Sequence, residues 1–180
     1  MATRTTRAER GGVTPREHAP DLRLELVGGG EWSLAERQPD HFTMIVFYRG
    51  HHCPVCRKQL AELNRRIDEF NERGVEVIAI SGDTAERAQQ SVDEWKLDRL
   101  RVGYGLSEAA MREWGLFVSS AIKDTEPPRF NEPGLFLIER DQTVFFESIQ
   151  SMPWGRPQID NLVHAVDFVL EKNYPARGES

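Results

Sequence analysis

The stretch MIVFYRGHHCPVC, residues 44–56, carries the strongest structural signal in this chain. Its first five residues are apolar and favour a β-strand buried on both faces of a sheet. Beyond it, apolar residues recur at a helical spacing, at Leu60, Leu63, Ile67 and Phe70. Cys53 and Cys56, the only two cysteines among the 180 residues, therefore lie where a strand turns into a helix.

The segments on either side of this turn predict a parallel strand-helix-strand crossover. We expect strands over residues 43–48 and 75–80, because both runs suit the centre of a buried sheet. One helix is expected between them over residues 56–73, since Gly74 is a good C-terminal cap. A crossover of this length between parallel strands is right-handed.

The remaining pattern completes an α/β protein. The alternating run over residues 22–26, three glycines and residues 32–34 predict a hairpin. Further expected elements are a helix over 84–96, a strand over 100–104, a helix over 107–114, a loop over 117–131, antiparallel strands over 135–138 and 143–146, and a helix over 158–172. This is the order of the thioredoxin-like fold, a central mixed sheet flanked by helices, with an N-terminal β-hairpin extension.

Composition restricts the organisation and the partners. Residues 1–18 predict a flexible tail, residues 19–174 one domain and residues 175–180 a C-terminal tail. We expect no membrane partner, because no apolar run approaches the roughly 20 residues of a spanning helix. We expect no nucleic-acid partner, because the net charge is −6 and no basic stripe is present. With no secretory signal visible, a cytoplasmic location is the expectation.

The cysteine spacing predicts redox chemistry. A thiol in the first turn of a helix sees unpaired backbone N–H groups, which stabilise its thiolate. Cys53 and Cys56 are about one turn apart, close enough to form a disulfide with each other. Arg49 and Arg57 could add positive potential. This chemistry uses the thiols alone, so we expect no cofactor and no bound metal.

Less reactive interpretations of the same residues stay open. The cysteines could be inert packing residues, or His51, His52 and the thiols could form half of a zinc site. No second cysteine or histidine pair completes such a site. The two histidines themselves are expected to be solvated loop residues rather than bases.

Several segments, in the same order, resemble the peroxiredoxin-like branch of the alkyl hydroperoxide reductase and thiol-specific antioxidant (AhpC/TSA) family, within the thioredoxin superfamily. These segments are residues 19–21 with the glycine-rich hairpin, residues 47–56, residues 134–138 and residues 148–156. The resemblance covers nearly the whole predicted domain and implies the same fold.

The resemblance places the peroxidatic cysteine of the family on Cys56. Cys53 then stands where the family has threonine, Arg49 where it has proline, and Gln59 where it usually has glutamate. Arg156 matches the second active-site arginine of the family.

Two further departures are similar to thioredoxins instead. Cys53 creates the Cys-x-x-Cys pair of that group, and Pro133 sits where thioredoxins carry a cis-proline facing the pair. In the family the position of Pro133 holds an arginine just before the core strand. An ordinary trans proline that begins a strand is the other interpretation of Pro133.

The resulting prediction is a thiol-disulfide redox enzyme with Cys53, Cys56, Arg156 and Pro133 at its catalytic site. Its oxidant is a peroxide or a protein disulfide, and the sequence leaves open which cysteine attacks first. The electron donor is an unidentified thiol, either a thioredoxin-like protein or a small molecule, and the chain could form a homodimer. The alternative of another class is a non-catalytic binding module on a thioredoxin-like scaffold.

Overall fold

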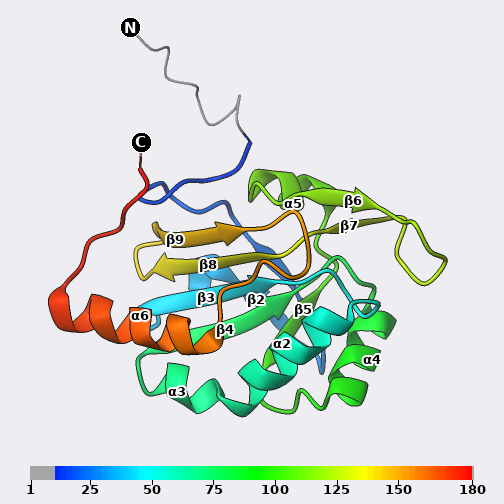
Figure 1. Cartoon of the computed structure of the whole chain (residues 1–180), viewed down its shortest axis with the longest axis horizontal. Coiled ribbons are helices and arrows are strands. Elements are labelled where there is room, and N and C mark those ends of the chain that lie inside the picture. Colours follow the sequence, from blue (N-terminus) through cyan, green and yellow to red (C-terminus); the bar gives the residue numbers. More distant parts are fainter. Residues whose placement is uncertain (1–10, 180) are drawn as a thin grey trace, which may run out of the picture.

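The computed structural model describes residues 11–179, and these form a mixed sheet of seven strands in the order β2-β1-β5-β4-β3-β8-β9 (Figure 1). The seven strands are β1 (Arg23–Leu26), β2 (Glu31–Ser33), β3 (Phe42–Phe47), β4 (Val75–Ile80), β5 (Arg101–Tyr104), β8 (Gly134–Glu139) and β9 (Val144–Ile149). β3 pairs with β4 in parallel and with β8 in antiparallel orientation. The predicted crossover and the predicted mixed sheet are therefore confirmed.

Every residue of β3 is buried, because the strand has cores on both of its faces. Met44 and Val46 face one core, and Ile45 and Phe47 face the other. The first core is covered by α2 (Pro54–Arg65), α3 (Ile67–Asn71), α4 (Ala85–Trp95) and α6 (Ile159–Lys172). The second core is covered by α5 (Glu108–Glu113), the N-terminal hairpin and the short 3₁₀ helix η1 (Leu34–Glu36).

The expected helix over residues 56–73 is two helices, and it begins earlier. Pro54 is the first residue of α2, where its missing N–H removes no hydrogen bond. Arg66 separates α2 from α3, with φ −106° and ψ 14°. Its guanidinium contacts Glu62, Glu69 and Asp160. The apolar positions continue through both helices, so their spacing alone could not reveal the break.

The expected loop over residues 117–131 contains a small hairpin, so this prediction was wrong. β6 (Val118–Ser120) pairs with β7 (Arg129–Asn131) in a separate two-stranded sheet. The strands have three residues each and show no alternating apolar pattern. Phe130 is the buried anchor of the hairpin.

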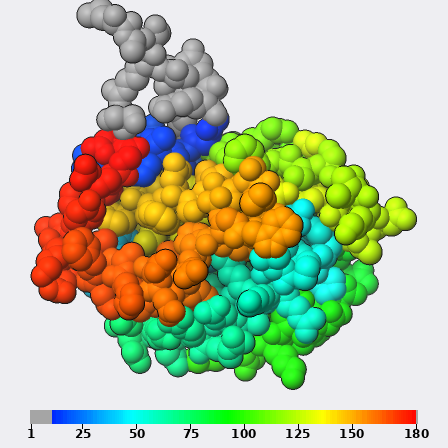
Figure 2. All heavy atoms as spheres, viewed as in Figure 1, coloured from blue at the N-terminus to red at the C-terminus, as the bar shows by residue number. Residues whose placement is uncertain are grey.

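The packed part of the chain starts before the expected boundary at Ala19. Val13 is buried, and the backbone N–H of Arg16 donates to Val144 O of β9 at 2.7 Å. Arg16 Nε also donates to Ala176 O, at 3.1 Å. Figure 2 shows this C-terminal segment, in red, lying against the residues before β1, in blue. Of the expected N-terminal tail, residues 1–10 lie outside the described residues.

Candidate active site

The two cysteines lie at the start of α2, directly after the central strand β3. Cys53 is the N-cap residue, with extended backbone, and its sulfur accepts the N–H of Cys56 at 3.2 Å. This bond satisfies one of the N–H groups that a helix leaves unpaired at its first turn. The thiol of Cys53 therefore has a structural partner that favours its ionised form.

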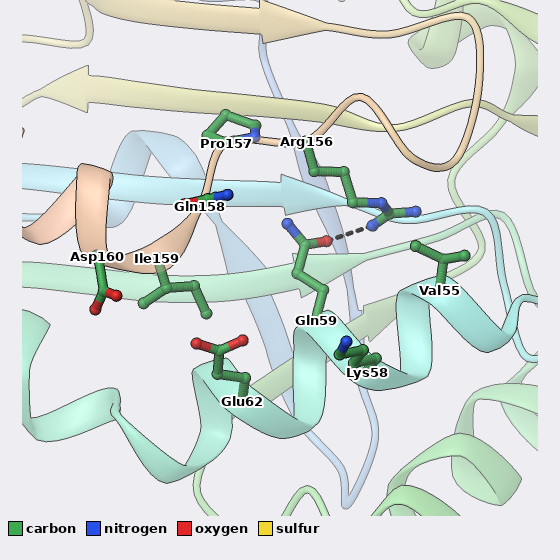
Figure 3. A pocket seen from close by; sticks show the side chains of 9 residues that line it. All are labelled: Val55, Lys58, Gln59, Glu62, Arg156, Pro157, Gln158, Ile159 and Asp160. Atoms are coloured by element: carbon green, nitrogen blue, oxygen red, sulfur yellow. Dashed lines mark hydrogen bonds between the residues drawn. The ribbon is translucent and has the colours of Figure 1, made fainter.

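Arg156 reaches both sulfurs from the segment between β9 and α6. Its Nη2 lies 2.9 Å from Cys56 Sγ and 3.9 Å from Cys53 Sγ. The same guanidinium donates to Pro153 O and to the amide oxygen of Gln59, a hydrogen bond that Figure 3 marks. All of these partners are formally neutral unless a thiol ionises. A thiolate is thus the counter-charge that Arg156 lacks.

Pro133 helps to hold the segment that carries Arg156. Its carbonyl accepts the N–H of Gln150 at 2.9 Å. A Cβ on Gly155 would lie 2.5 Å from the side-chain oxygen of Gln150, so a larger residue there would displace that side chain. The peptide bond before Pro133 is trans, as are the other described peptide bonds, so of the two interpretations of Pro133 the ordinary trans proline is the one observed. Pro133 instead leads directly into β8, where a missing N–H is tolerated.

Arg49 supplies a second guanidinium, which is paired with an acid. Its backbone N–H donates to Cys56 Sγ at 3.4 Å. Its side chain lies over the ring of Phe130 and forms a buried ion pair with Glu132, with Nε 3.1 Å from Oε2. Arg49 therefore brings positive charge to the segment just before Pro133. Arg57, the other expected source of positive potential, is exposed.

The environment of the two thiols differs, although both are buried. Cys53 and Cys56 are 1% and 0% exposed. The pKa of Cys53 is lowered to about 6, above all by the hydrogen bond from the Cys56 thiol, then by the backbone N–H of Cys56 and by Arg156. Burial and the hydrogen bond to Cys53 raise the pKa of Cys56. The two shifts have opposite directions, so the environment favours ionisation of Cys53 over ionisation of Cys56.

A buried carboxylate beyond β4 fixes the loop before the cysteines. Asp83 accepts the backbone N–H of His51 at 2.7 Å and is paired with Arg87 Nε at 3.1 Å. Gly50 has φ +130°, and a Cβ there would lie 2.7 Å from Asp83 Oδ1. Sequence reasoning missed Asp83. Asp83 follows β4, and β4 is parallel to β3, so both strands end at the same edge of the sheet. A polar residue just after β4 could therefore have been predicted to lie near the cysteines that follow β3.

The expectation that His51 and His52 are solvated was wrong. His51 stacks on Trp95 with a ring separation of 5.8 Å, and its Nδ1 lies 3.1 Å from Ser91 Oγ. His52 packs edge-on against Phe130, and both of its ring nitrogens are buried without a hydrogen-bond partner. Burial, and then the charge of Arg49, lower the pKa of His52 to about 4. These contacts make both rings packing groups, and within residues 11–179 no cluster of three or more histidines, cysteines or acids could hold a metal.

The geometry is that of a paired-thiol site, and comparison with known proteins identifies its family. The model of the AhpC/TSA family matches residues 15–146. The chain belongs to the AhpC/TSA family. Membership confirms the resemblance and the predicted class, a thiol-dependent oxidoreductase of the peroxiredoxin type.

Relatives in this family are distant in sequence. The chain is 25% identical over 166 residues to 1-Cys peroxiredoxin B of Oryza sativa subsp. indica, covering 88% of this chain and 74% of that protein. It is 24% identical over 161 residues to alkyl hydroperoxide reductase C of Helicobacter pylori, covering 84% of this chain and 78% of that protein.

Solved structures confirm the fold. A cysteine-to-serine mutant of peroxiredoxin 6 from Arenicola marina superimposes with a TM-score of 0.77, at 15% identity, over 90% of this chain and 76% of that one. The reduced 2-Cys peroxiredoxin of Plasmodium vivax gives 0.71, at 18% identity, over 89% of this chain and 84% of that one. Among the described helices, none combines the length and the apolar character needed to cross a bilayer.

Proposed function

We propose that this AhpC/TSA-family protein reduces peroxides by cycling Cys53 and Cys56 between dithiol and disulfide. The observation that carries the proposal is the position of Arg156, whose Nη2 lies 2.9 Å and 3.9 Å from the two sulfurs and has no acidic partner among the described residues. A cation held there stabilises a thiolate before reaction and the negative charge that develops on the peroxide oxygen during it.

In the first step, the Cys53 thiolate attacks one oxygen of the peroxide. A sulfur–oxygen bond forms, the oxygen–oxygen bond breaks, and the leaving oxygen takes a proton to become water or an alcohol. Cys53 is then a sulfenic acid, oxidised by two electrons. Its lowered pKa supports this assignment, because the thiolate is the nucleophile.

In the second step, Cys56 attacks the sulfenic sulfur and the hydroxyl group leaves as water. The Cys56 N–H already contacts Cys53 Sγ at 3.2 Å, so the two residues adjoin before any movement. The attack is therefore intramolecular and needs no second chain. For hydrogen peroxide the balance is one dithiol and one peroxide giving one disulfide and two waters.

Burial of the sulfurs favours a peroxide over a protein disulfide as the oxidant. Cys53 is 1% exposed, which leaves little surface for the disulfide of a second protein to approach in line. A peroxide has the size of a few atoms and needs only a narrow path. A non-catalytic binding module would have no use for a half-buried arginine directed at two thiols.

The reverse order, with Cys56 attacking first, is a second candidate. It is supported by the family position of Cys56 and by two donors aimed at its sulfur, the backbone N–H of Arg49 at 3.4 Å and Arg156 at 2.9 Å. The two orders predict different single variants. Cys56→Ser retains the first step if Cys53 attacks, and loses it if Cys56 attacks.

The test measures the reaction of hydrogen peroxide with the reduced wild type, Cys53→Ser and Cys56→Ser by rapid mixing and mass spectrometry. We expect the wild type to lose two hydrogens, Cys56→Ser to gain one oxygen, and Cys53→Ser to react far more slowly. Oxygen addition confined to Cys53→Ser would reverse the order. A wild type that consumes no peroxide would refute the proposed function.

The electron donor in this proposal is a thiol. A homodimer and a cytoplasmic location stay predictions from the sequence.

A further inference from the structure

A polar cavity lies beside the dithiol, between α2 and the start of α6. Its volume is about 320 Å³, and it is lined by Lys58 and Glu62 from α2 and by Arg156 and Asp160 from the facing segment (Figure 3). Arg156 is shared between this cavity and the sulfurs, because the same guanidinium contacts Cys56 Sγ at 2.9 Å. The cavity is therefore the described hollow that adjoins the reacting groups.

The acids and the bases that line the cavity differ in how they are paired. Asp160 and Glu62 both contact Arg66, at 2.7 Å and 3.4 Å, so their charge is already offset. Lys58 has no ion-pair or hydrogen-bond partner among the described residues. Arg156 contacts only neutral oxygens and the two sulfurs. The cavity thus presents two cations that lack acidic partners, and it suits a ligand that carries a carboxylate.

The burial of the sulfurs restricts what can reduce them after a peroxide has reacted. A disulfide between Cys53 and Cys56 would form among residues that are 1% and 0% exposed. A folded protein donor must bring its own sulfur into line with that disulfide, which a buried position hinders. A small thiol bound in the cavity is separated from the sulfurs only by the side chain of Arg156, which lines the cavity and contacts Cys56 Sγ.

We propose that this cavity binds the electron donor, and that the donor is a low-molecular-weight thiol bearing a carboxylate. The inference rests on the proposed function. Lys58 pairs with the carboxylate, and the donor thiolate attacks one sulfur of the disulfide. The other sulfur leaves as a thiolate facing Arg156. A second donor thiol then attacks the mixed disulfide, so that two donor thiols become one donor disulfide and the Cys53–Cys56 dithiol is restored.

The test measures how fast three small thiols of similar size reduce the disulfide form of the full-length protein. The compounds are 3-mercaptopropionate, 2-mercaptoethanol and cysteamine. Besides the thiol they carry a carboxylate, an uncharged hydroxyl group and an ammonium group, respectively. Rates of disulfide reduction are divided by the thiolate concentration of each compound and then by the rate of the same thiolate with a small uncharged disulfide, which removes differences in ionisation and in intrinsic nucleophilicity. We expect the anionic thiol to react about 5- to 10-fold faster than the neutral one at low salt, the neutral one to exceed the cationic one, and the advantage to shrink as salt rises.

Matched variants decide whether Lys58 is responsible. Lys58→Met is expected to reduce the advantage of 3-mercaptopropionate to below about two-fold. Arg57→Met removes a neighbouring exposed charge that does not line the cavity, and it should keep the full advantage. Equal rates for the three compounds after both corrections, or an advantage that survives in Lys58→Met, would overturn the inference.

Failure of this inference can be separated from failure of the proposed function. The disulfide form is prepared with diamide, which oxidises a dithiol without a peroxide, so the donor comparison does not depend on peroxidase activity. Peroxide consumption supported by the neutral reductant dithiothreitol is measured in parallel. If the protein consumes peroxide but shows no preference for the thiol with a carboxylate, only the donor site is refuted. If it prefers that thiol but consumes no peroxide, only the peroxidase activity is refuted.

Discussion

The guanidinium of Arg156 lies 2.9 Å from the sulfur of Cys56. Its oxygen partners, Pro153 O and the amide oxygen of Gln59, are both neutral. An unpaired cation next to two thiols acts on whichever of them ionises first. Arg49, the second arginine near the sulfurs, has its charge offset by the buried carboxylate of Glu132. The unpaired positive charge beside the sulfurs therefore comes from Arg156, and the groups that hold its guanidinium set where that charge acts.

Removing this charge should slow the reaction with peroxide. We expect Arg156→Gln to lower the second-order rate constant by about 10- to 100-fold, the usual value of a charge-assisted hydrogen bond. The measurement is rapid mixing of reduced protein with hydrogen peroxide. Arg57→Gln is the control, because it removes an exposed charge of the same helix. Equal losses in both variants would mean that only general surface potential matters.

The neutral amide of Gln59 should be required for the full effect of Arg156. In Gln59→Glu, the new carboxylate would pair with Arg156 and offset its charge toward the thiols. We expect a higher pKa for the reactive thiol and a rate about 10-fold lower. Gln90→Glu makes the same charge change on the exposed face of α4 and should have no effect. An unchanged thiol pKa in Gln59→Glu would contradict this role.

Alkylation of the reduced protein by iodoacetamide should depend on pH with a midpoint near 6, the pKa of Cys53. The folded pKa lies below the ~8.5 of an unfolded cysteine. The thiolate therefore stabilises the reduced fold fully above pH 8.5, and this contribution is lost as the pH falls through about 6. Because the Cys56 thiol is the largest cause, Cys56→Ala should move the midpoint upward more than Cys56→Ser, which keeps a hydroxyl donor. Identical midpoints in the two variants would argue against that hydrogen bond.

Acid should destabilise the fold through His52. Its folded pKa of about 4 lies below that of a free histidine, so the unfolded chain binds the proton first. Stability should fall as the pH drops from about 6.5 toward 4, by an amount on the order of 1–3 kcal/mol. Urea unfolding of His52→Phe across this range should show a smaller decline, while His164→Phe, at an exposed position, should follow the wild type. A parallel decline in all three proteins would assign the acid sensitivity elsewhere.

Local sequence signals were sufficient for most of the fold. The apolar runs of β3 and β4 predict strands, and the apolar face of α6 predicts a helix. These patterns are long enough to give the element type without any tertiary information. The β6–β7 hairpin could not be predicted, because its three-residue strands depend on a tertiary anchor, Phe130. The break at Arg66 leaves the apolar spacing intact and therefore gives no signal.

The candidate site was predictable only in part, for a related reason. Cys53 and Cys56 are neighbours in sequence, and Arg156 came from a family resemblance. Arg49 forms an ion pair with Glu132, and the N–H of His51 donates a hydrogen bond to Asp83. Each is one isolated contact between positions that are distant in the chain, so it leaves no periodic pattern in the sequence. The conformation of Pro133 likewise depends on the backbone around it.

The sulfur and the guanidinium that meet in the finished site are separated by 100 residues along the chain. During synthesis, Cys56 therefore leaves the ribosome long before Arg156 exists. In that interval Arg156 cannot act on the sulfurs, so one of the causes that lower the pKa of Cys53 is missing. The electrostatic environment of the two thiols is therefore complete only when the segment between β9 and α6 has folded against the start of α2.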